Sequence, residues 1–211
     1  MHIAILGAGI IGVTTAYELA ADGHQVTVFE RHASVAEGAS FANAGVVAPG
    51  YVTPWAAPGM PVKVLRHLLG RHAPVRVRRP LAAADVAWMR RWHAACEPAR
   101  YAANRARMQR LAFYSRHRLH EVAARMAYDF DRTTGYMVLL RGAKDQFLVQ
   151  PGLALLRELG VPFHEISADE ARQLEPALHP HTPLAGAIHL PQDEVGNCRQ
   201  FAVILRDAAE Q

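Results

Sequence analysis

The stretch Ile3-Ala4-Ile5-Leu6-Gly7-Ala8-Gly9-Ile10-Ile11-Gly12, with Val26-Thr27-Val28-Phe29-Glu30 after it, decides the fold of this 211-residue chain. An apolar run, three closely spaced glycines and a second apolar run predict a strand, a glycine turn, a helix to Ala21 and a parallel strand. The second strand ends at an acidic residue. This order is typical of the first segment of a doubly wound α/β fold.

Each residue type in this segment has a physical role. Gly7 permits a tight turn out of the strand, Gly9 lets backbone approach a pyrophosphate, and Gly12 allows the helix to pack on the sheet. The unpaired amides at the start of the helix favour negative charge. Glu30, 18 residues after Gly12, can accept hydrogen bonds from a ribose hydroxyl. Asp22-Gly23 predicts the end of the helix, and the whole segment predicts a dinucleotide site.

The composition allows a sizeable core and excludes several classes of protein. Hydrophobic residues make up 51% of the chain, yet no apolar run reaches transmembrane length. The apolar start lacks the basic leading segment of a signal peptide, so we expect a cytoplasmic protein. Cys96 and Cys198 predict reduced thiols rather than a disulfide or CxxC site. His117 and His120 are interpreted as surface histidines, and no metal site is expected.

Positive charge is concentrated in the middle of the chain. Residues 61–132 contain 16 Lys or Arg and five Asp or Glu, whereas the whole chain has a net charge of +4. Much of this block falls on a helix expected at 100–126. A solvated basic face, a peripheral membrane contact and a nucleic-acid contact all remain open, with nucleic acid least favoured because no binding motif accompanies the charge. The mainly apolar stripe of this helix consists of Met108, Leu111, Ser115, Leu119, Val122 and Met126.

Further elements are predicted along the rest of the chain. The segment 49–61, with four prolines and two glycines, indicates irregular structure, and Trp88, Met89 and Trp92 are expected in the core. Ser167 and Glu170 form a capping box. Strands are expected at 136–140, 162–166 and 185–190, and helices at 62–70, 83–95, 153–159, 168–174 and 197–209.

The chain resembles a known family over almost its whole length. It is similar to the small subunits of bacterial D-amino-acid dehydrogenases, within the wider D-amino-acid oxidase-like group of FAD enzymes. The run Pro54-Trp55-Ala56-Ala57-Pro58-Gly59 is much more specific than the glycine turn. The other matching stretches are Gly7 to Val13, Ser40 to Gly45, Pro49-Gly50-Tyr51, Arg71 to Pro74, Tyr114-Ser115-Arg116, Glu175 to Leu178 and Leu190 to Cys198.

The resemblance implies a fold and a set of cofactor contacts. The fold would be a Rossmann-like FAD-binding domain, incomplete here, with a helical insertion and the start of an α+β substrate domain. Tyr51 would lie near the substrate, and no catalytic residue is assigned. The residues expected to bind FAD are Ile3, Leu6, Gly7, Ala8, Gly9, Ile10, Ile11, Gly12, Tyr17, Glu30, Arg31, Ser40, Asn43, Ala44 and Gly45.

The resemblance also implies a reaction and partners. Such enzymes, which serve D-amino acid catabolism, convert a D-amino acid to a 2-oxo acid and ammonia, and FAD accepts the electrons. The electrons pass to a respiratory-chain acceptor, so a peripheral contact with the cytoplasmic face of the inner membrane is expected, and nucleic acid is not. The expected divisions are residues 1–60 (first FAD segment), 61–130 (helical insertion), 131–195 (partial substrate domain) and 196–211 (helix returning to the FAD domain).

Some features depart from the family pattern. Val46 stands where the family usually has Gln, and Pro151-Gly152 is expected to interrupt a helix that relatives continue. Relatives are about twice as long, so we expect an inactive fragment. Alternatives are a flavin amine oxidase for glycine-like or sarcosine-like substrates, an NADP enzyme in which Arg31 meets the 2′-phosphate, and a non-catalytic basic binding module.

Overall fold

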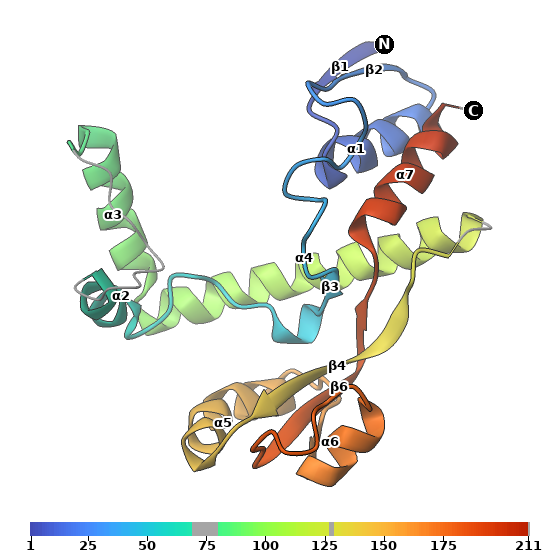
Figure 1. Cartoon of the computed structure of the whole chain (residues 1–211). Coiled ribbons are helices and arrows are strands. Elements are labelled where there is room, and N and C mark those ends of the chain that lie inside the picture. Colours follow the sequence, from blue (N-terminus) through green and yellow to red (C-terminus); the bar gives the residue numbers. More distant parts are fainter. Residues whose placement is uncertain (69–79, 127–128, 211) are drawn as a thin grey trace. The chain divides into compact units, whose positions relative to one another are not determined.

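The structure is a computed structural model that describes residues 1–68, 80–126 and 129–210. The chain forms two compact units. The first unit comprises residues 1–50 and 119–211, and the second unit comprises residues 51–118. Figure 1 labels most of the elements and colours the chain along its sequence.

The first unit begins with the predicted strand, turn, helix and strand. Strand β1 (His2–Leu6) pairs in parallel with β2 (Gln25–Phe29), and Ile3 lies opposite Val26. Helix α1 (Ile10–Ala21) connects the two strands. The helix ends where expected because Gly23 adopts a left-handed conformation with φ +80°.

Helix α7 (Cys198–Ala209) packs against α1, and the two helices lie side by side in Figure 1. It starts at Asn197, whose side-chain oxygen accepts a 3.1 Å hydrogen bond from the Gln200 amide. This capping replaces a missing intrahelical partner. The core of this part of the unit consists of Ala8, Val13, Val35, Ala36, Val122, Phe130, Phe201, Ala202 and Leu205.

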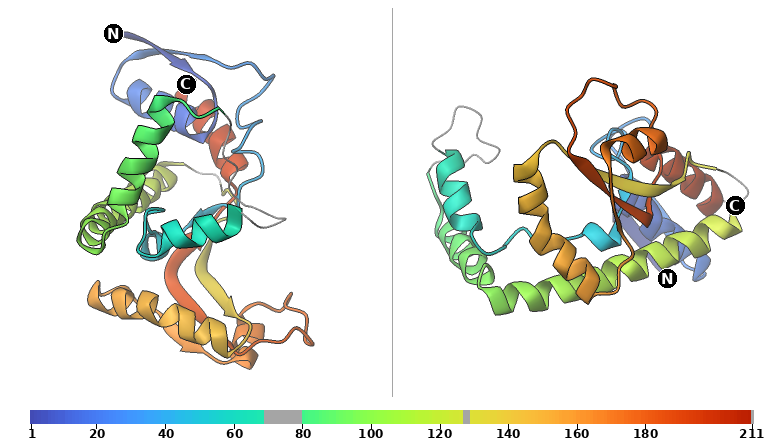
Figure 2. Two further views of the ribbon diagram at one scale, coloured as in Figure 1. Left: turned by 90° about the vertical axis from the view of Figure 1, so that its left-hand side faces the viewer. Right: turned by 90° about the horizontal axis from the view of Figure 1, so that it is seen from below.

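A separate antiparallel sheet is organised around one long strand, β6 (Gly186–Val195). This strand pairs with β4 (Thr133–Leu140), β3 (Val46–Val47) and β5 (His164–Ile166). Helix α5 (Ala143–Glu158) contacts β4, and α6 (Ala168–Leu174) contacts β6, as Figure 2 shows. The predicted capping box at the start of α6 is confirmed, because the Ser167 hydroxyl accepts from the Glu170 amide at 3.2 Å.

Two expectations for this sheet region were wrong. Helix α5 continues through Pro151 instead of breaking there. Proline removes one backbone donor from a helix, whereas Leu153 and Leu156 in the following turn are both fully buried, and their burial outweighs that loss. Strand β6 also continues past the expected end at 190 to Val195, because β3 and the start of β4 pair with its last residues.

The second unit is helical over most of the residues described. A short 3-10 helix at Pro49–Tyr51 precedes it within the segment expected to be irregular. Its helices are α2 (Met60–Leu68), α3 (Ala83–Ala95) and most of α4 (Pro98–Arg125). Residues 69 and 70 of the helix expected at 62–70 lie outside the described residues. Among all described helices, none combines the length and apolar character needed to cross a bilayer.

The expected core residues of α3 and the expected stripe of α4 need correction. No residue of α3 is buried, and Trp88 is 59% exposed. Its ring stacks on that of Trp92, with 6.5 Å between the ring centroids. The α4 stripe does not form one continuous surface. Val122 is buried in the core of the first unit, and Leu119 and Met126 pack against that core. Leu111 remains exposed.

Candidate dinucleotide site

The glycine turn between β1 and α1 is closed around two glycines. The Gly7 amide donates a 2.8 Å hydrogen bond to the Phe29 carbonyl at the end of β2, and Gly7 has φ +99°. A Cβ on Gly12 would overlap the Gly7 carbonyl oxygen. Because the helix approaches the turn this closely, Gly12 has no room for a side chain.

Gly9 is the N-cap residue immediately before α1, and its surroundings leave room for a close approach. A Cβ built on Gly9 would meet only the Ser40 hydroxyl, at 3.4 Å, among the described residues. The first amides of a helix have no intrahelical acceptor, and the first turn of α1 contains no acidic residue. This helix start can therefore receive an anionic group at close range.

Ser40 connects the predicted flavin loop to the same helix start. Its buried hydroxyl accepts a 3.0 Å hydrogen bond from the Ile10 amide. We expect Ser40→Ala to lower the free energy of unfolding by about 1 kcal/mol, since it removes a cap of α1. Urea unfolding followed by circular dichroism measures this loss. Ser115→Ala on the exposed side of α4 is the control and is expected to change stability by less than about 0.5 kcal/mol.

The Glu30 carboxylate holds the ends of the turn together. One oxygen accepts from the Ala8 amide at 2.7 Å, and the other accepts from the His32 amide at 2.9 Å. These amide bonds, led by that of Ala8, lower the pKa of Glu30 from its ordinary value of 4.5. Each carboxylate oxygen retains a further lone pair that can accept a hydroxyl hydrogen. The ionised group therefore orders the turn and can still accept bonds from a ribose.

This lowered pKa predicts a pH-dependent contribution to stability. The folded chain favours ionised Glu30, so its contribution is complete above pH 4.5 and is lost as pH falls through the lower folded-state pKa. We expect Glu30→Gln to lower the urea midpoint relative to wild type at pH 7, and to lower it much less at pH 3. An equal difference at both pH values would contradict the role of the charge. Glu158→Gln, at an exposed position on α5, supplies the matched control.

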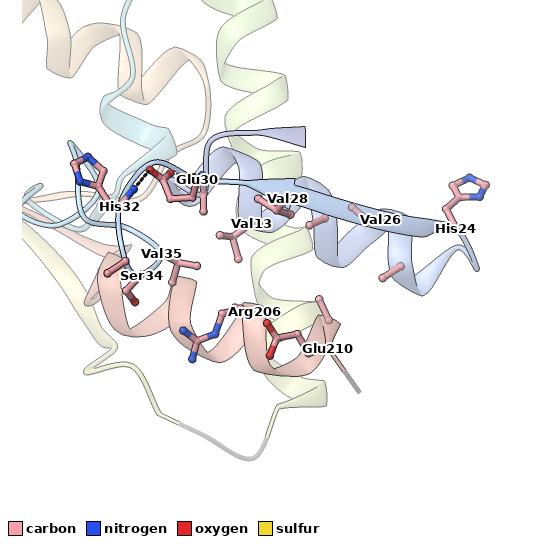
Figure 3. A pocket seen from close by; sticks show the side chains of 15 residues that line it. Val13, His24, Val26, Val28, Glu30, His32, Ser34, Val35, Arg206 and Glu210 are labelled. Atoms are coloured by element: carbon pink, nitrogen blue, oxygen red, sulfur yellow. Dashed lines mark hydrogen bonds between the residues drawn. The ribbon is translucent and has the colours of Figure 1, made fainter. Parts of the chain in front are cut away.

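A pocket of about 590 Å³ adjoins Glu30 between α1, β2 and α7 (Figure 3). Val26 and Val28 of β2 form one apolar wall, and Arg206 and Glu210 project from α7 (Figure 3). Apolar walls with charged groups at the margin suit a flat ring that carries hydroxyl groups. The remaining lining residues are Ala8, Val13, Ala16, Ala20, His24, Glu30, His32, Ala33, Ser34, Val35 and Ala209.

The other expected cofactor residues fall into three places. Ile3, Leu6, Ile11 and Tyr17 belong to β1 and α1, and Tyr17 packs against the core. Arg31 is exposed, with its Nε 3.2 Å from Nε2 of His32. Asn43, Ala44 and Gly45 belong to the loop before β3.

That loop is held against the end of β6. The Asn43 side-chain oxygen accepts from the Gly45 amide at 2.7 Å, and the Gly45 carbonyl accepts from the Gly196 amide at 2.9 Å. Gly45 has φ +62°, and a Cβ there would overlap the Gly196 carbonyl. Tyr51 lies in the second unit, so its expected substrate contact stays a prediction.

Sequence reasoning missed an ion cluster around Glu194. This buried β6 carboxylate pairs with His120 of α4 and lies 3.8 Å from the Arg132 guanidinium. His120 lies at the surface as expected, and its contact with Glu194 is the feature that the sequence did not indicate. The sequence did contain one sign of this cluster: Asp193 and Glu194 are adjacent acids next to an apolar run. Buried charges require partners, so this pair could have indicated an ion cluster. The Arg206 and Glu210 side of the pocket was also missed.

Comparison with known proteins defines the class to which this fold and site belong. The model of the DAO family, described as FAD dependent oxidoreductase, matches residues 2–211, so the chain belongs to this family of FAD-dependent oxidoreductases. The chain is 44% identical over 213 residues to the D-amino acid dehydrogenase of Cereibacter sphaeroides. That match covers 100% of this chain and 49% of the relative.

Two solved structures show the same fold. Glycine oxidase from Geobacillus kaustophilus has a TM-score of 0.59 at 22% identity, covering 98% of this chain and 43% of that protein. Iminodiacetate oxidase from Chelativorans sp. BNC1 has a TM-score of 0.60 at 19% identity, and the match covers 100% of this chain and 44% of that protein. The chain thus spans about half the length of the relatives it matches. The family confirms the predicted Rossmann-like fold class and favours FAD over NADP as the cofactor.

Proposed function

We propose that this chain supplies the part of a D-amino-acid dehydrogenase that holds the pyrophosphate and adenosine of FAD. The observation that carries the cofactor role is the open helix start at Gly9, with the Glu30 carboxylate turned toward the same glycine turn. The identity of 44% over the whole chain supports a D-amino acid as the substrate. The electron acceptor proposed for the enzyme is a component of the respiratory chain.

The residues present fit the chemistry of FAD. Two phosphate charges would meet the amides of Gly9 and Ile11, beside the Ile10 amide that donates to Ser40, and no acidic side chain of the first turn repels them. Glu30 would accept the ribose hydroxyls, and the adenine would enter the apolar pocket beside β2. The loop from Ser40 to Gly45 would lie along the flavin, with its shape fixed by the Gly45–Gly196 contact.

When bound, FAD would supply the acceptor for a hydride, that is one proton with two electrons, from the α-carbon of the amino acid. The imino acid so formed takes up water and releases ammonia and a 2-oxo acid. The residues of this chain bind and orient the cofactor, and we propose no catalytic base among them. Residues 1–60 and 196–211 are proposed as the cofactor side, 61–130 as a helical insertion and 131–195 as part of the substrate domain.

The proposed enzyme also includes a peripheral contact with the inner membrane, close to its electron acceptor. The positive charge of the second unit supports this proposal, because its described residues include ten Lys or Arg and only two Asp or Glu. A basic surface of this kind attracts anionic lipid.

A chimaera tests the proposed function. The chain would replace the matching half of the Cereibacter sphaeroides dehydrogenase, and purified protein would be assayed with an artificial electron acceptor. We expect D-alanine to reduce the acceptor, and Gly9→Val in the chimaera to abolish this activity. Oxidation of glycine or sarcosine, without oxidation of any D-amino acid, would contradict the proposed substrate class. A parallel spectrum of the 211-residue chain after incubation with FAD and desalting tests cofactor binding even where the chimaera fails to fold.

A further inference from the structure

Helix α2 has two chemically different faces, and neither is buried. Its polar residues, Lys63, Arg66 and His67, share one side of the helix and are all basic or titratable. Its remaining residues are apolar and occupy the other side. On that apolar side Val62 is 56% exposed and Leu65 is 62% exposed. Among the described residues, these two side chains of the apolar face are left largely uncovered.

Neighbouring parts of the second unit extend the apolar surface. A cavity is lined by Pro61 and Val62 at the start of α2, by His93 near the end of α3, and by Cys96 just after α3. The two helices therefore adjoin each other. Trp88 of α3 is exposed, and Trp55, before α2, is 72% exposed. Tryptophan side chains are enriched where one end of a residue is apolar and the other is wet, as at the surface of a bilayer.

The described residues of the same unit carry a large positive net charge. Its described residues carry a formal charge of +8, whereas the whole chain carries +4. Both of its described acids serve helix starts: Asp85 accepts from the Ala82 amide, and Glu97 accepts from the Ala99 and Arg100 amides. Neither acid lies on α2, so nothing on that helix opposes its positive charge.

We propose that α2 is an interfacial helix that seats the second unit on an anionic lipid surface. Val62 and Leu65 enter the boundary between headgroups and acyl chains, and Lys63 and Arg66 meet the lipid phosphates. This inference rests on the membrane contact in the proposed function, and it assigns that contact to the exposed surface of α2. The stripe of α4 is a poorer surface because its later residues pack in the core of the first unit. A nucleic acid is a poorer partner than lipid, because it would bind the positive charge but leave the apolar face exposed to water.

Vesicle flotation of the 211-residue chain, without flavin or amino acid, tests the apolar face. We expect binding to vesicles of phosphatidylcholine with 30% phosphatidylglycerol, and at least tenfold weaker partition for the Val62→Ser/Leu65→Ser variant. Phe147→Ser/Leu148→Ser is the matched control, because these apolar α5 side chains of the first unit are at least as exposed as Val62 and Leu65. The control is expected to bind like wild type. Wild-type partition by Val62→Ser/Leu65→Ser would overturn the proposal.

A charge variant gives an independent measurement. Lys63→Glu/Arg66→Glu is expected to lower partition at least tenfold, since each basic residue near an anionic surface contributes about 1 kcal/mol. Both variants should keep the wild-type melting temperature because all four side chains are exposed. Absence of vesicle binding by wild type, or a wild-type dimer that Val62→Ser/Leu65→Ser converts to monomer, would instead show that no lipid covers this face. Neither result would alter FAD binding by the chain, which is measured separately.

Discussion

Replacing Gly12 with alanine is expected to lower the free energy of unfolding by about 3 kcal/mol or more. The added Cβ would overlap the Gly7 carbonyl oxygen and lie 3.1 Å from the Gly7 carbonyl carbon. Both are backbone atoms, and Gly7 is fixed by its hydrogen bond to Phe29. The turn, the helix or the strand pair must therefore move. For a chain of this length the melting temperature should fall by roughly 10 °C, as measured by circular dichroism.

Gly152→Ala is the matched control for this change. Gly152 also lies within a helix, α5, and a Cβ there would contact nothing within 4 Å among the described residues. Alanine is favoured over glycine in a helix by up to about 1 kcal/mol. We therefore expect Gly152→Ala to preserve or raise stability. Equal melting temperatures for wild type and Gly12→Ala would show that the turn is looser than its geometry indicates.

The features predicted correctly from the sequence are those specified by nearby residues. The β1–α1–β2 segment needs only its own glycines and apolar spacing, and the Ser167–Glu170 capping box spans four positions. The glycine turn from Gly7 to Gly12, to which cofactor contacts are assigned as a prediction, could be located for the same reason. The position of Glu30 beside this turn could also be expected, because only one helix and one strand separate it from the turn.

The features missed depend on partners far apart in the sequence. Glu194 meets His120 across 74 positions, and no local pattern specifies this pair. The α7 side of the pocket forms because α7 packs against α1. The sequence of neither helix alone indicates this packing. Trp88 was misplaced because an aromatic side chain on a helix indicates the need for a partner, not where the partner comes from. The same property that misled the core prediction supports an interfacial role for the second unit.

Gly9→Val is expected to weaken FAD binding by at least 100-fold while leaving the fold intact. Gly9 has φ −69° and ψ 176°, an extended conformation that valine adopts readily. Its Cβ would meet only the Ser40 hydroxyl, at 3.4 Å, so the change in stability should stay below about 1 kcal/mol. The valine methyl groups would occupy the space through which a pyrophosphate reaches the first amides of α1. A 100-fold loss corresponds to about 2.7 kcal/mol of binding free energy.

Titration of the chain with FAD, followed by flavin fluorescence, measures this loss directly. FAD should also raise the melting temperature of wild type and leave that of Gly9→Val unchanged, since a ligand stabilises only a fold that binds it. Gly142→Val is the matched control, because Gly142 is likewise an extended glycine at the start of a helix and its Cβ would meet nothing within 4 Å among the described residues. It should bind FAD like wild type. Equal affinities for wild type and Gly9→Val would mean that the phosphates do not approach this helix start, whereas loss in both variants would point to a general effect of valine at a helix start.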